Sequence, residues 1–201
     1  MAEEKDIYFG APKEHVEYAK KIVPKMGGMM ALMAKAIYEK YGEEGIEVMA
    51  AEVKRAAVAK GEKFTKELGY TPEEVTVPIA LSEIYAKSHG DLAAAGLDLR
   101  RQKLTDDESE SHVHYCGLCE GWKTTWDKPW YLCYIFSTIH DIGFMEGVNP
   151  KLEWIGHAED WIGTGKEPTE VQKGLAHYPA GHCKPGDDQE NVCVMRLKLH
   201  K

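Results

Sequence analysis

The stretch LDLRRQKLTDDESESHVHYC, residues 97–116, decides the fold class of this chain. Two leucines, Leu97 and Leu99, precede a basic patch, and an acidic run follows over residues 106–110. The basic patch consists of Arg100, Arg101 and Lys103. Two β-strands joined by an acidic turn account for this order of residues.

Downstream of this stretch the chain continues as a mixture of helix and strand. We expect a helix over residues 129–146, a strand over 151–157 and a long loop over 164–186, which is rich in Gly, Pro and Lys. Residues 192–199 alternate, which is typical of a strand with one buried face. The residues on that face are Cys193, Met195, Leu197 and Leu199.

Upstream of residue 96 the hydrophobic residues recur at helical spacing. The predicted helices cover residues 12–24, 29–41, 46–68 and 81–95, and we expect Pro24, Gly42 and Gly69 to end the first three. The methionine-rich face of residues 29–41 is interpreted as core. Thr71, followed by Pro72 and two glutamates, is a further helix-start signal.

Together these elements predict an α+β fold, with an N-terminal helical layer packed on a small antiparallel sheet and one further helix. The 201 residues are 43% hydrophobic, which suffices for the core of a single domain spanning 1–201. Within it, residues 1–95 form the mainly helical part. Residues 96–201 form the part that bears the sheet, the helix 129–146 and the functional site.

Composition and charge narrow the functional class. The formal net charge of −8 leaves no broad basic surface, so we expect no nucleic-acid partner. The first residues are polar, and the sequence has no long apolar run. We therefore expect a cytoplasmic protein that is not secreted and has no membrane partner. We expect a small-molecule substrate as partner, and the acidic surface is compatible with a homo-oligomer.

The first candidate site is the sequence HVHYCGLC, residues 112–119. On a strand His112, His114 and Cys116 would share one face, with Cys119 following on a turn. Imidazole and thiolate groups of this kind bind zinc or iron, which are the candidate cofactors. The alternatives are a half-buried strand with inert thiols, and a zinc site that only stabilises the sheet.

The second candidate site lies on the helix 129–146. Cys133, His140 and Asp141 fall at spacings that place them on one wall of a pocket. An imidazole that is oriented by a carboxylate can activate a thiol for attack on an electrophilic carbon. Cys133 alone is equally explained as a small buried hydrophobic residue.

In their order along the chain, these pieces resemble the L-2-amino-thiazoline-4-carboxylic acid hydrolase family. The resemblance rests on AIYEKYGEEG (36–45), the strand ending at Cys116, Asp141 before GVNPKL (147–152), and GDD (186–188) before CVMR (193–196). It implies hydrolytic opening of a cyclic amidine-like carbon in a ring that contains sulfur and nitrogen.

The resemblance also implies roles for the candidate residues. Cys116 or Cys133 would be the nucleophile, His140 the proton carrier and Asp141 the group that orients it. Alternatively, a metal ion held by the residues of the first candidate site would supply hydroxide. The competing interpretation is a non-catalytic, sensor-like protein that binds a small ligand or a metal in the same pocket.

Overall fold

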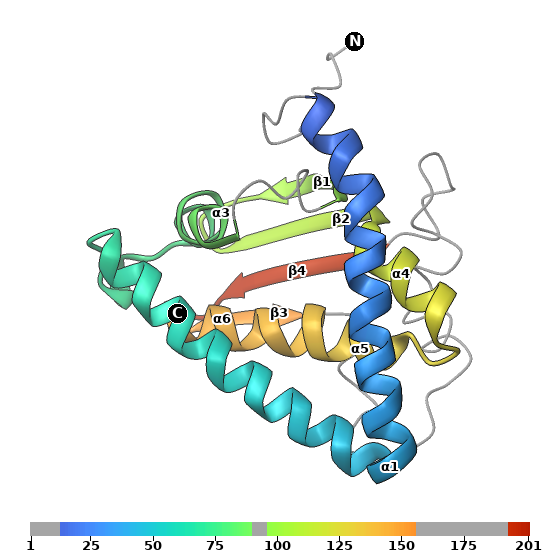
Figure 1. Cartoon of the computed structure of the whole chain (residues 1–201). Coiled ribbons are helices and arrows are strands. Elements are labelled where there is room, and N and C mark those ends of the chain that lie inside the picture. The colour runs from blue at the N-terminus through green and yellow to red at the C-terminus, as the bar shows by residue number, and fades with distance from the viewer. Residues whose placement is uncertain (1–12, 90–95, 156–192) are drawn as a thin grey trace.

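The computed structural model describes residues 13–89, 96–155 and 193–201 (Figure 1). Within them, helices pack against a four-stranded antiparallel sheet, which confirms the predicted α+β class. In Figure 1 the long, bent helix α1 lies in front, and α6 lies between the C-terminal half of α1 and the strands. The predicted loop 164–186 lies outside the described residues.

Helix α1 (Lys13–Glu67) is bent into two arms at Gly42, where φ is 63° and ψ is −148°. Glycine is the residue that adopts this conformation without a steric penalty, so the break predicted at Gly42 is confirmed. The break predicted at Pro24 is wrong, because the helix continues through it. The carbonyl of Pro24 lies directly against Gly121 of another helix, and this packing stabilises the turn that the proline would otherwise weaken.

Each arm of α1 packs on a different helix through glycines. The first arm contacts α4 (Gly117–Thr125), and the second contacts α6 (His140–Val148). A Cβ atom on Gly147 of α6 would fall against the Val58 carbonyl. Helix α4 was not expected from the sequence, which placed Cys119 on a turn.

The methionine-rich face of α1 is not core. Met29, Leu32 and Met33 are 66%, 59% and 59% exposed, whereas Ala31 and Ala34 are fully buried. The small alanines belong to the cluster that holds the aromatic side chains of α4 and α5, where the helices approach closely, and of the neighbouring methionines Met30 packs against this cluster. The prediction that this face is core is therefore wrong.

The remaining helices are short segments that follow one another in two consecutive series. The first runs through η1 (Pro72–Glu74), α2 (Val77–Ile79), η2 (Ala80–Tyr85) and α3 (Ala86–His89), and the second through α5 (Trp130–Cys133), η3 (Tyr134–Ile139) and α6. Thr71 precedes η1 as expected, and Gly69, with φ of 82°, follows the end of α1. Segments η2 and η3 are π-helical, and such wide turns often occur at functional sites.

The sheet has the strand order β1-β2-β4-β3, and each neighbouring pair is antiparallel. Its strands are β1 (Leu97–Leu104), β2 (Glu108–Cys116), β3 (Leu152–Ile155) and β4 (Cys193–Leu199). The predicted strands are confirmed, although residues 156, 157 and 192 lie outside the described part. Along β4, Leu197 is buried between exposed Arg196 and Lys198, as the alternation predicted.

No helix among the described residues is long and apolar enough to cross a membrane.

Candidate functional site

A cavity of about 340 Å³ lies between the sheet and the helices. Its volume falls in the range of small-molecule sites, and most of its wall is apolar. Polar and reactive groups interrupt this wall at a few places. They include His89, His140, Asp141, Arg101, the thiols of Cys116, Cys119 and Cys133, and the hydroxyl groups of Tyr85, Ser109, Ser111 and Ser137.

An irregularity in strand β2 determines which of its side chains reach the cavity. Leu99 pairs with Val113 and Asp98 with Tyr115, so one extra residue lies between the two pairs on β2. Such a bulge shifts every following side chain to the opposite face. As a result Val113 and Cys116 both line the cavity, although they are three residues apart.

Cys116 stands at the N-terminal end of α4, immediately before its first turn. The pKa of the Cys116 thiol is lowered, first by the side chain of Cys119 and then by the backbone N–H groups of Cys119 and Leu118, against the effect of burial. Donors at a helix N-terminus stabilise a thiolate in this way. A lowered pKa increases the share of thiolate, the form in which a cysteine can attack carbon.

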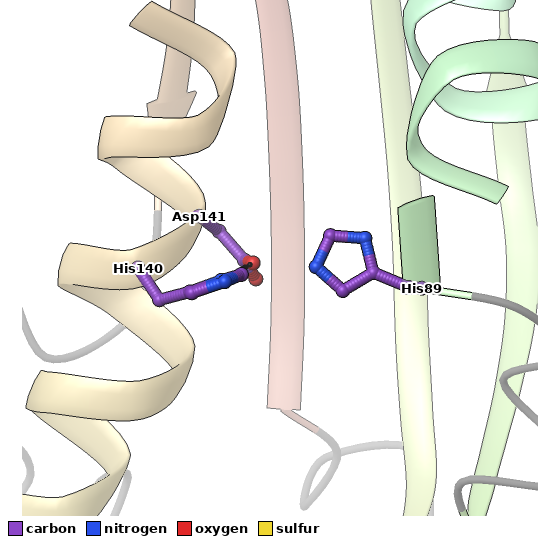
Figure 2. Close-up of side chains that lie close together, drawn as sticks. All are labelled: His89, His140 and Asp141. Carbon is purple, nitrogen blue, oxygen red and sulfur yellow. Dashed lines mark hydrogen bonds and ion pairs between the residues drawn. The ribbon is translucent and has the colours of Figure 1, made fainter. Parts of the chain in front are cut away.

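On the opposite wall, α6 presents His140 and Asp141, and α3 presents His89 (Figure 2). His140 Nδ1 lies 2.9 Å from Asp141 Oδ1. The Tyr85 hydroxyl donates a hydrogen bond of 3.1 Å to the same oxygen. One ligand atom from each of His89, His140 and Asp141 lies within 4.8 Å of the others, which is close enough to hold a metal ion.

Burial shifts the pKa values of Asp141 and His89. Asp141 is 4% exposed, and desolvation raises its pKa, although His140, Tyr85 and Lys60 favour the charged form. Desolvation lowers the pKa of His89 to about 3, with a further contribution from the charge of Lys60. His89 is thus a neutral imidazole at physiological pH.

Arg101 of β1, which pairs with Ser111 of β2, also lines the cavity. Its Nη1 lies 3.4 Å from Ser82 Oγ, while its buried Nε has no hydrogen-bond partner in the described structure. Burial lowers the pKa of Arg101, but a guanidinium stays charged at neutral pH. A buried donor without a partner and a positive charge together suit a carboxylate ligand.

A family model described as L-2-amino-thiazoline-4-carboxylic acid hydrolase matches residues 25–167. The chain belongs to this family. The resemblance inferred from the sequence is therefore confirmed, and the family's description supports a hydrolase-like function on a thiazoline. No curated protein and no solved structure gives a significant match.

The structure brings together most of the residues predicted for the site of this family member. Cys116, Cys119, Cys133, His140 and Asp141 all line the cavity. Their chemical roles stay predictions, because position alone does not test them.

The predicted metal-binding group is separated in part. His112 does not line the cavity, and its Nε2 lies 2.9 Å from Glu110 Oε1. The expectation that His112 and Cys116 share one face fails because of the bulge between them. The side chain of His114 lies outside the described part of the structure.

Sequence reasoning missed His89 and Tyr85, and it assigned Arg101 only to a basic patch. The one signal for the first two is their spacing of four residues, which places them on one side of a helix. That spacing is common in helices without any function, so the sequence could not single them out.

Proposed function

We propose that this protein hydrolyses a C–N bond of a small cyclic amidine in the cavity, with Cys116 as the nucleophile. The observation that carries the proposal is the lowered pKa of Cys116 at the N-terminal end of α4, on the cavity wall. A thiolate attacks carbon far better than a thiol does, and a cavity of this volume admits a five-membered ring.

The proposed reaction has three stages. The Cys116 sulfur first adds to the C=N carbon between the heteroatoms, and the ring nitrogen takes up the proton that left the thiol. The ring C–N bond then breaks as the exocyclic amino group becomes an imine and passes a second proton to the departing nitrogen. Water finally replaces the Cys116 sulfur at that carbon and restores the thiol, while the substrate keeps its own C–S bond. His140 and Asp141 lie in the same cavity and assist the nitrogen as it departs.

Arg101 positions the substrate in this proposal. The family's description names a carboxylic acid, and the unpartnered Nε of Arg101 supplies a donor for a carboxylate. A cytoplasmic location, as the sequence predicts, would keep the thiol reduced. The partner expected is accordingly a small anionic heterocycle.

The proposal is tested by turnover of 2-aminothiazoline-4-carboxylate, followed by the appearance of the ring-opened product. We expect Cys116→Ser to reduce kcat by at least about 1,000-fold, because a hydroxyl is a far weaker nucleophile at neutral pH. Cys133→Ser is the matched control and should keep most of the activity, since the wild-type nucleophile is intact.

A Cys116→Ser variant that retains full activity would refute the role of Cys116. Covalent labelling gives an independent check. A slowly hydrolysed substrate analogue should add its mass to Cys116 in the wild-type chain and leave Cys116→Ser unmodified.

A further inference from the structure

We infer that His89, His140 and Asp141 form a binding site for a divalent transition-metal ion. The three side chains come from two helices, α3 and α6, and meet at the cavity wall. Among the residues that the structure describes, they form a group of His, Cys or acidic side chains with mutual distances within 4.8 Å. Two imidazoles and one carboxylate suit zinc or iron(II) and leave coordination positions open.

Hydrogen bonding determines which nitrogen of His89 is available. Its Nδ1 lies 3.0 Å from the Tyr85 carbonyl oxygen and 2.5 Å from Ser88 Oγ, and the Ser88 hydroxyl itself donates to that carbonyl. A proton on Nδ1 suits both of these acceptors. The lone pair is then on Nε2. That atom is buried and has no hydrogen-bond partner in the described structure.

The Nε2 atom of His89, which has no hydrogen-bond partner in the described structure, faces the carboxyl group of Asp141. Figure 2 shows the His89 ring opposite the Asp141 carboxylate, with His140 beside the latter. A buried lone pair and a buried carboxylate that face one another repel unless an electropositive group lies between them. A cation placed there satisfies both groups.

The neighbouring contacts hold the proposed ligands in place. The His89 ring stacks on Tyr85 with centroids 3.9 Å apart, and the Tyr85 hydroxyl donates to Asp141. His140 Nδ1 lies 2.9 Å from Asp141 Oδ1, and a proton on Nδ1 would leave the Nε2 lone pair of His140 for a metal. Histidine ligands of metal sites are oriented by such bonds to carbonyl and carboxylate oxygens.

Charge at the site does not oppose a divalent ion strongly. Lys60 is the neighbouring cation that acts on both Asp141 and His89. Burial lowers the pKa of Lys60, which shows that the protein environment already disfavours its charge.

This inference deepens the proposed function, because a bound ion would act as the Lewis acid that assists the departing nitrogen. The binding itself does not depend on turnover. A test of metal binding can therefore give a positive or negative result independently of the role of Cys116.

The test is titration of the metal-depleted full-length protein with Co²⁺, followed by visible absorption and by calorimetry. We expect one ion per chain, with Co²⁺ affinity reduced at least about 10-fold in His89→Gln and in Asp141→Asn. His112→Gln is the matched control, since His112 lies outside the cavity and should leave the affinity unchanged.

Two further variants keep the result unambiguous. Tyr85→Phe retains all three ligands and removes only the hydroxyl that orients Asp141, so it should weaken Co²⁺ binding even if His89→Gln fails to fold. Cys116→Ser should lose turnover and keep the Co²⁺ affinity and spectrum.

Several outcomes would overturn the inference. These are no stoichiometric Co²⁺ binding by the wild-type chain, full affinity in a folded His89→Gln variant, or loss of the ion in Cys116→Ser. The last result would assign the ion to the thiols instead. The first two outcomes would not bear on the role of Cys116, whereas the third would make Cys116 a metal ligand and count against its role as nucleophile.

Discussion

Gly147→Ala should destabilise the protein and displace the helix that carries His140 and Asp141. The added Cβ would fall against the Val58 carbonyl oxygen, and it would lie 2.9 Å from Val58 C and 3.0 Å from Val58 Cα. Real Cβ atoms essentially never approach heavy atoms within 3.0 Å, so α1 and α6 must separate by on the order of 1 Å.

The expected loss of stability in Gly147→Ala is the difference between two opposing effects. Overpacking a close contact costs typically 1–3 kcal/mol, and the upper end applies because backbone atoms cannot rotate away. Alanine restores about 1 kcal/mol of helix propensity relative to glycine. The net change in the free energy of unfolding should be a loss of about 2 kcal/mol, which in a chain of this size lowers Tm by roughly 4–8 °C.

Thermal and urea unfolding of Gly147→Ala beside Gly28→Ala provides the assay. A Cβ on Gly28 would meet the Thr125 hydroxyl at 3.0 Å, where the side chain can rotate, and the Gly121 carbonyl oxygen at an ordinary contact distance of 3.8 Å. Gly28→Ala should therefore be neutral or slightly stabilising. Equal stability of the two variants would refute the claim that the α1–α6 contact requires glycine.

Three further changes test the site and its supports. Cys119→Ala removes the group that most lowers the pKa of Cys116, so the pH midpoint for alkylation of Cys116 by iodoacetamide should rise. Arg101→Met should raise KM for a carboxylate substrate about 10-fold or more with little change in kcat, as steady-state kinetics would show. Asn149→Ala should cost about 1–3 kcal/mol in urea unfolding, because buried Asn149 bonds to two backbone groups.

Matched controls sharpen these tests. Cys119→Ser keeps a side-chain donor and should shift the Cys116 midpoint less than alanine does; an equal shift would contradict the assigned cause. For Arg101, an uncharged ester of the substrate should show no rise in KM. Loss of binding for both substrates would point to a packing defect. For Asn149, stability within about 0.5 kcal/mol of the wild type would show that its bonds to backbone are replaced by water.

The sequence predicted those features that depend on local physical chemistry. Alternation identified the strands, helical spacing identified the helices, and Gly42 marked the bend in α1 because its φ of 63° suits glycine. The order of motifs also led to the family, which the match over residues 25–167 confirms. None of these conclusions required knowledge of which elements touch.

The errors arose where a contact or a single extra residue overrode the local pattern. Pro24 stays within a helix because its turn packs on Gly121. The bulge in β2 moves Cys116 to the cavity face and leaves His112 beside Glu110. Alternation along a strand predicts which side chains share a face only where the strand has no bulge. No sequence signal marked the bulge in β2.

Periodicity and turn chemistry thus determined most of the elements and the α+β class, and helical spacing placed Cys133, His140 and Asp141 on one cavity wall. Only the tertiary structure decided that Tyr85 and Asp141, 56 residues apart in the chain, share a hydrogen bond, and that His89 joins them. The physical reason is that a hydrophobic pattern reports which side of a helix is buried, whereas the partner it meets depends on how separate helices pack.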